Sequence, residues 1–164
     1  MRTTTTAPKH PVHPIVVLDY RVRIPGMIFV ALFALSHFRG RPLPPLLVAA
    51  MVLTGLVWPH AAYFLARRAR DTKQAELRNL LVDSFIVGCW IAAMSFSLWP
   101  TVAMIATMMN GNLAVGGFRF AGMGVLGIVA GVLAAGALLG FQPVFASGIL
   151  TSLVLFGLGR SSRN

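Results

Sequence analysis

Two ionisable residues, His60 and Asp83, lie inside apolar blocks of the sequence, where Asn110 and Asn112 add two amide side chains. Ionisable groups at membrane depth are costly, so each calls for a functional or structural reason. Three interpretations are open. The residues tie helices together through a His–Asp pair and two amides, form a signal or ligand site, or conduct protons or ions.

A Trp-Pro pair, Trp58 and Pro59, directly precedes His60. A proline inside a helix removes one backbone hydrogen bond and frees a carbonyl, which nearby polar groups can satisfy. The candidate signal site or polar network therefore comprises His60, Asp83, Asn110, Asn112, Trp58 and Pro59. One His and one Asp are too few ligands for a metal site. A haem held by two histidines of one subunit is not expected, because His37, the other histidine in a predicted span, lies near the opposite membrane face. No cofactor is assigned.

The elements that must position these residues are apolar blocks long enough to cross a bilayer. Six such blocks are predicted, at residues 24–38, 43–66, 80–98, 100–117, 119–141 and 143–159. Residues 80–118 would form a helix of about 57 Å, nearly twice the hydrocarbon thickness. Trp99-Pro100 is expected to divide it at an outer turn, and Gly116-Gly117 to mark the next inner turn.

The basic residues predict the orientation of these six helices. With a cytoplasmic amino terminus, 12 of the 14 Lys and Arg residues fall on the inner side: Arg2, Lys9, Arg21, Arg23, Arg67, Arg68, Arg70, Lys73, Arg78, Arg119, Arg160 and Arg163. Short cytoplasmic loops carry an excess of basic residues, so both termini are expected in the cytoplasm. Arg67, Arg68, Arg78 and Arg119 are the predicted cytoplasmic anchors, and residues 67–79 an inner connection with a short surface helix that places Glu76 near Lys73.

This topology gives the polar residues a common depth. His60, Asp83 and the two asparagines lie five to nine residues from inner basic residues, which places all of them roughly 7–14 Å inside the cytoplasmic boundary. His60 and Asp83 are therefore expected to be neighbours.

Composition excludes several classes of protein. A mean hydropathy of +0.78 with 57% hydrophobic and 11% charged residues is too apolar for a soluble domain of 164 residues. The basic residues that give the net charge of +10 flank the predicted spans, so they are expected to contact anionic lipids rather than nucleic acid. Residues 1–20 are expected to form a disordered or interfacial tail, and 21–164 an integral membrane domain. No catalytic constellation is present, so this chain is not expected to be an enzyme.

Glycines dominate the fifth predicted span. Gly127 and Gly131, then Gly136 and Gly140, are four residues apart, a spacing that allows helices to approach closely. Packing within one bundle is favoured over a dedicated dimer contact. The single cysteine, Cys89, is expected to act as a small buried hydrophobe.

Five sequence segments resemble the second family of bacterial membrane-associated sensor domains. They are Arg21–Pro25, Val57–Tyr63, Glu76–Ser84, Trp90–Met94 and Asn112–Gly117. The specific part of the resemblance is Trp-Pro-His followed by Arg-Asn-x3-Asp, and beyond Arg119 only the hydropathy is similar. Domains of this family precede diguanylate or adenylate cyclase domains, so the resemblance implies an integral membrane signal-input domain whose catalytic domain is absent from these 164 residues.

The resemblance also implies partners and a location. It implies a multi-pass protein of the bacterial inner membrane, a homodimer, and a cytoplasmic cyclase domain acting in cis or in trans. The lipid bilayer is the other expected partner, and no nucleic acid is expected. Two alternatives are a membrane anchor that dimerises without sensing and a small proton-coupled transporter. The polar layer lies off the midplane, which argues against a carrier.

Overall fold

The computed structural model describes residues 12–38 and 44–140, and within those ranges all regular structure is helical. Two of the helical stretches are long and apolar enough to cross a membrane, Pro45–Arg68 and Leu98–Leu139. The predicted all-α class is therefore confirmed. The predicted sixth span, residues 143–159, lies outside the described residues.

Helix α1 spans Pro14–His37 and begins earlier than expected. Pro14 occupies the first turn, where its missing N–H costs nothing, and the His13 side chain accepts a hydrogen bond from the Ile15 N–H. Val16 is fully buried. Residues 14–20, expected to belong to the tail, are thus the first turns of a packed helix.

Helices α2 (Pro45–Val52) and α3 (Trp58–Arg68) form one rod interrupted by a π-helical turn, η1 (Leu53–Val57). Pro59 explains the interruption, because proline has no N–H to donate and its ring collides with the carbonyl four residues earlier. The backbone widens just before it, and the Trp58 N–H reaches the Leu53 carbonyl, five residues back.

Helix α4 spans Thr72–Ala93, and the Asp71 side chain caps its start by accepting a hydrogen bond from the Gln74 N–H at 2.9 Å. The sequence predicts a membrane span that begins at residue 80 and a separate surface helix before it. The two are instead one helix, and Glu76 is fully buried rather than at the surface beside Lys73. The helix ends in a turn whose residues Ser95 and Phe96 have positive φ.

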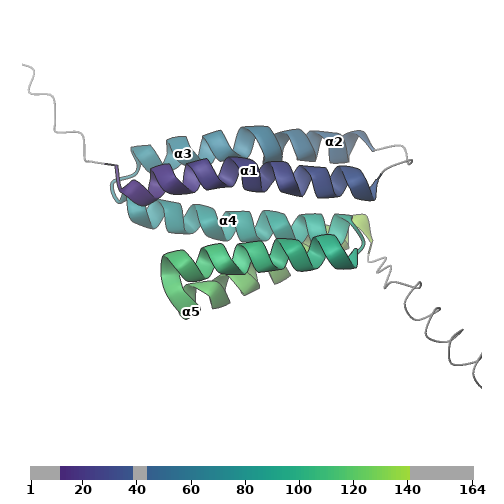
Figure 1. Cartoon of the computed structure of the whole chain (residues 1–164). Coiled ribbons are helices and arrows are strands. Elements are labelled where there is room, and N and C mark those ends of the chain that lie inside the picture. Colours follow the sequence, from purple (N-terminus) through teal and green to yellow (C-terminus); the bar gives the residue numbers. More distant parts are fainter. Residues whose placement is uncertain (1–11, 39–43, 141–164) are drawn as a thin grey trace, which may run out of the picture.

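Helix α5 (Leu98–Leu139) doubles back on itself at Gly117, where φ is 68° and ψ is −167°. Residues with a Cβ rarely adopt this conformation, so the glycine allows the reversal. In a straight helix Asn112 and Gly124 would be about 18 Å apart. Here the Asn112 side chain lies against Gly124. Figure 1 shows the two arms, residues 98–116 and 118–139, running in opposite directions, as the predicted inner turn requires.

The α4–α5 contact depends on glycines. Gly88 lies against the backbone of Ile128, and Gly131 against the backbone of Phe85, so that a side chain at either position would collide with a neighbouring helix. Gly127 packs against Ser84, and Gly136 is buried. Gly140 ends α5 with a φ of 79°, and a Cβ at this position would meet nothing among the described residues.

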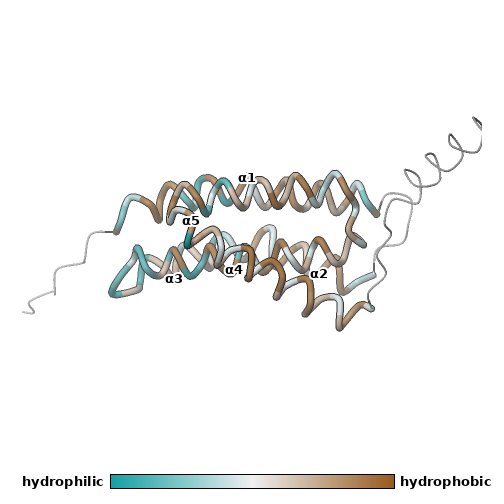
Figure 2. The backbone as a smooth tube through the Cα atoms, turned by 90° about the horizontal axis from the view of Figure 1, so that it is seen from below, coloured by the Kyte–Doolittle hydropathy of each residue, from teal (hydrophilic) through white to brown (hydrophobic). Residues whose placement is uncertain are grey.

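Apolar side chains fill the core and also cover much of the surface. A buried cluster joins Ala34, Val87, Trp90, Ile91, Met94, Met104 and Ile128. Large apolar side chains such as Phe29, Leu126 and Phe118 remain exposed, as expected of helices that face lipid. In Figure 2, hydrophilic residues gather at the end of the molecule where α1 begins and α3 ends.

Candidate functional site

Arg23 of α1 is buried against α4, with 5% of its surface exposed. Its guanidinium forms three ion pairs, with Asp19 at 2.9 Å, Glu76 at 2.5 Å and Asp83 at 2.8 Å. Asp19 lies one turn before Arg23 on α1, whereas Glu76 and Asp83 are on α4. We call these four residues the Arg23 cluster.

Neutral groups extend the cluster to a third helix. The Trp58 indole N–H donates to Asp83 at 2.5 Å, and the Asn79 amide donates both to the Ala62 carbonyl at 2.9 Å and to Glu76 at 3.3 Å. Trp58 and Ala62 belong to α3. Glu76, Asn79 and Asp83 follow one another at spacings of three and four residues, which places them on one face of α4. A single network thus joins α1, α3 and α4.

The Arg23 cluster has unbalanced charge. It holds three of the four acidic residues of the whole chain around one arginine. The side chains of Glu76 and Asp83 are 0% and 3% exposed, and that of Asp19, which precedes the predicted first span, is 15% exposed. Burial, followed by the hydrogen bond to Glu76, raises the pKa of Asp19 to about 8, although Arg23 acts in the opposite direction. Arg23 also retains one buried nitrogen, Nη1, that has no hydrogen-bond partner among the described residues.

His60 lies outside the cluster. Its exposed ring shares a hydrogen bond of 3.0 Å with the Tyr20 hydroxyl, and Tyr20 stacks on Tyr63 with ring centroids 4.4 Å apart. Among the described residues, no hydrogen bond or ion pair joins His60 to Asp83, so the expected His–Asp pair is not formed. The physical reason is that Arg23, which the sequence analysis counts only among the basic residues of the inner side, donates a hydrogen bond to the Asp83 carboxylate at 2.8 Å.

The two asparagines have different environments. Asn112 is fully buried and donates to the Ser84 hydroxyl at 3.1 Å, which joins the first arm of α5 to α4. Its side-chain carbonyl oxygen is buried and has no partner within residues 12–38 and 44–140. Asn110 is exposed, so the structure does not bring it to the same site. Pro59 is buried in the rod, and the predicted anchors Arg67, Arg68, Arg78 and Arg119 are all exposed.

Sequence reasoning missed four residues of this network: Asp19, Arg23, Glu76 and Asn79. One signal was present, because Asp19 and Arg23 are four residues apart, a spacing at which helical side chains meet. The rarity of acidic residues was another, since a chain with only four of them has few partners for a buried arginine.

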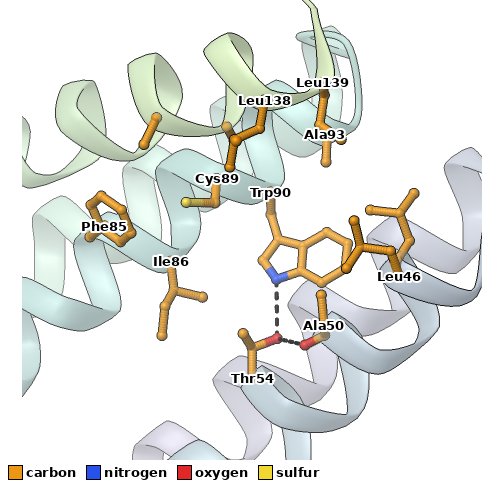
Figure 3. Close-up of a pocket in the computed structure, with 13 residues that line it drawn as sticks. Leu46, Ala50, Thr54, Phe85, Ile86, Cys89, Trp90, Ala93, Leu138 and Leu139 are labelled. Carbon is orange, nitrogen blue, oxygen red and sulfur yellow. Dashed lines mark hydrogen bonds between the residues drawn. The ribbon is translucent and has the colours of Figure 1, made fainter.

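A cavity of about 380 Å³ lies between α2, α4 and the second arm of α5. Figure 3 shows its apolar walls, with Leu46, Phe85 and Leu138 among the side chains that line it. The Thr54 hydroxyl on its wall is already paired, because it donates to the Ala50 carbonyl at 2.7 Å and accepts from the Trp90 indole at 3.2 Å. The described walls of the cavity therefore suit apolar groups, and their one hydroxyl is already hydrogen-bonded.

Residues 18–106 match the family model described as the MASE2 domain, which is more than half of the chain. The chain belongs to the MASE2 domain family. The matched residues of this MASE2 domain include the whole Arg23 cluster, Trp58, Asn79 and the first part of α5.

Curated relatives of this MASE2 domain include the probable diguanylate cyclase DgcC of Escherichia coli strain K12, 31% identical over 130 residues. The protein of the same name from Escherichia coli O6:H1 strain CFT073 has the same identity over the same length. The alignment covers 77% of this chain and 35% of each relative, so the chain spans about a third of their length. No solved structure matches the chain significantly.

Proposed function

We propose that this MASE2 domain is the membrane-embedded signal-input domain of a nucleotide cyclase, acting in cis or in trans. The observation that carries the proposal is the Arg23 cluster, which joins α1 to α3 and α4 inside a region similar to a probable diguanylate cyclase. An anchor needs apolar surface and basic flanks. It does not need three carboxylates buried around one arginine, because buried ion pairs are poor sources of stability.

In this proposal the domain is not an enzyme itself. It lies in the bacterial inner membrane as a multi-pass protein of about six spans with both termini in the cytoplasm, and it forms a homodimer. A parallel two-fold dimer would hold two attached cyclase domains on the same membrane face, where they can meet. A signal changes cyclase output only if it binds two arrangements of the helices with different affinity.

The test is a fusion of this chain to a diguanylate cyclase domain, with the cyclic dinucleotide product measured in membranes. Asp83→Asn weakens the interaction with Arg23 while keeping the side-chain shape, and His60→Ala removes the hydrogen bond to Tyr20. Both are expected to change output at unchanged membrane insertion and expression. Gln74→Ala, which alters an exposed, uncharged side chain of α4, is the control and is expected to preserve output.

If both variants keep normal output under every condition, and deletion of the helices abolishes only membrane targeting, the domain is a plain anchor. If purified protein in vesicles instead moves protons or a solute, the transporter interpretation replaces both.

A further inference from the structure

The charged groups that face the interior of the Arg23 cluster come from two helices. Helix α1 contributes Asp19 and Arg23, and α4 contributes Glu76 and Asp83. Helix α3 contributes only neutral groups to it, the Trp58 indole and the Ala62 carbonyl. The titratable groups of α3 that face α1 are His60 and Tyr63, and both contact Tyr20, which precedes the predicted first span. With all carboxylates ionised, three negative charges would face one positive charge.

Such an arrangement is costly in a buried site. Each uncompensated ion taken out of water costs several kcal/mol, and carboxylates held close together cannot all stay ionised. A metal ion is not the expected solution, because the described residues contain no group of three or more acidic, His or Cys side chains placed to hold one. A proton is the smallest cation that can reduce this charge, and one bound proton lowers the excess from two negative charges to one.

We propose that the Arg23 cluster is a proton-binding site. It keeps one carboxylic acid protonated near neutral pH, and release of that proton weakens the contact of α1 with α4. Asp19 is the group through which the proton exchanges, because its side chain is the most exposed of the three carboxylates. Release leaves repulsion between Asp19 on α1 and the two carboxylates on α4. The free Nη1 of Arg23 marks a buried donor that a water molecule can join.

The direction of the pH effect follows from Asp19. Its pKa is raised from 3.8 to about 8 in the folded protein, so the folded state holds a proton that the unfolded state releases. The stability that this proton contributes is fully present below the unfolded pKa and is lost as the pH rises through the folded one. The docking of α1 therefore weakens from mildly acidic to mildly alkaline pH. A role of protons as the signal rests on the proposed input function. The existence of the proton-binding site does not.

The experiment is an infrared pH titration of the purified full chain in lipid nanodiscs, which follows the carbonyl stretch of protonated carboxylic acids. The chain has only four acidic side chains, so few bands overlap. A band that disappears between about pH 6 and 9 is expected, and Asp19→Asn is expected to remove it. The matched control is Asp71→Asn, because Asp71 is the one acidic residue outside the cluster and Asn also caps helices well.

A second measurement is the melting temperature of the same three proteins across this pH range. The melting temperature of the wild type and of Asp71→Asn should fall as the pH rises, and that of Asp19→Asn should change less. Carboxylates that are all ionised from the acid end of the range upward, with identical titrations for wild type and Asp19→Asn, would overturn the proton site. That result would leave the input function untouched, since the cyclase fusion tests it independently.

Discussion

Replacement of Arg23 by Met tests whether the cluster holds the helices together. Met preserves much of the side-chain length but leaves Asp19, Glu76 and Asp83 without their shared positive partner. Removing one partner of a buried ion pair costs about 3–5 kcal/mol, because the remaining charge stays buried and unpaired. Arg23 has more than one such partner even when Asp19 holds a proton, so a destabilisation at the upper end of that range is expected near neutral pH, with a smaller value in acid.

The assay is reversible unfolding of the purified chain in mixed micelles, followed by helical circular dichroism. Arg21→Met is the matched control, because Arg21 lies two residues earlier on the same helix, carries the same charge and is exposed. Surface substitutions usually change stability by no more than about 0.5 kcal/mol. If Arg23→Met and Arg21→Met were equally stable at pH 7, Arg23 would not be the buried centre of an ion cluster.

Two further predictions concern packing and topology. Gly131→Ala should destabilise the protein by about 1–3 kcal/mol, because the added Cβ would meet the Phe85 backbone. At Gly122 an added Cβ would meet nothing among the described residues, so Gly122→Ala should be neutral or stabilising. Equal unfolding curves for the two variants would contradict the described α4–α5 contact. In a cysteine-free background, a cysteine at the exposed position Lys73 should react with membrane-impermeant reagents only from the cytoplasmic side, and one at Trp99 only from outside. Labelling of position 73 from outside would refute the proposed orientation.

The sequence predicted the helical class and the reversal at Gly117 because both depend on local signals. A long apolar run cannot be one span, and a Gly-Gly pair beside an arginine marks where it turns. The rule that places basic residues at the cytoplasmic side assigns each to a membrane face, but it does not say whether a side chain points to lipid or into the bundle. Arg21 and Arg23 are therefore indistinguishable to it, although one is exposed and the other buried.

For the same reason, the sequence predicts only part of the candidate site. Asp83 and Trp58 stood out because a carboxylate and a Trp-Pro pair are unusual within apolar helices. Glu76 did not, since the polar run before residue 80 is typical of a surface connection. Only the continuation of α4 back to its Asp71 cap places Glu76 on the same helix face as Asp83, where it meets Arg23.

The π turn at Leu53–Val57 sets the rotational phase of the rod formed by α2 and α3. Each residue of an α-helix advances the side chains by about 100°, so one residue removed from the turn would rotate everything before it by that angle relative to everything after it. With Trp58 kept on Asp83, Ala50 and Leu46 would turn away from the cavity wall beside Trp90. The extra residue of the π turn thus lets one rod contact both the Arg23 cluster, through Trp58, and the apolar cavity, through Ala50 and Leu46.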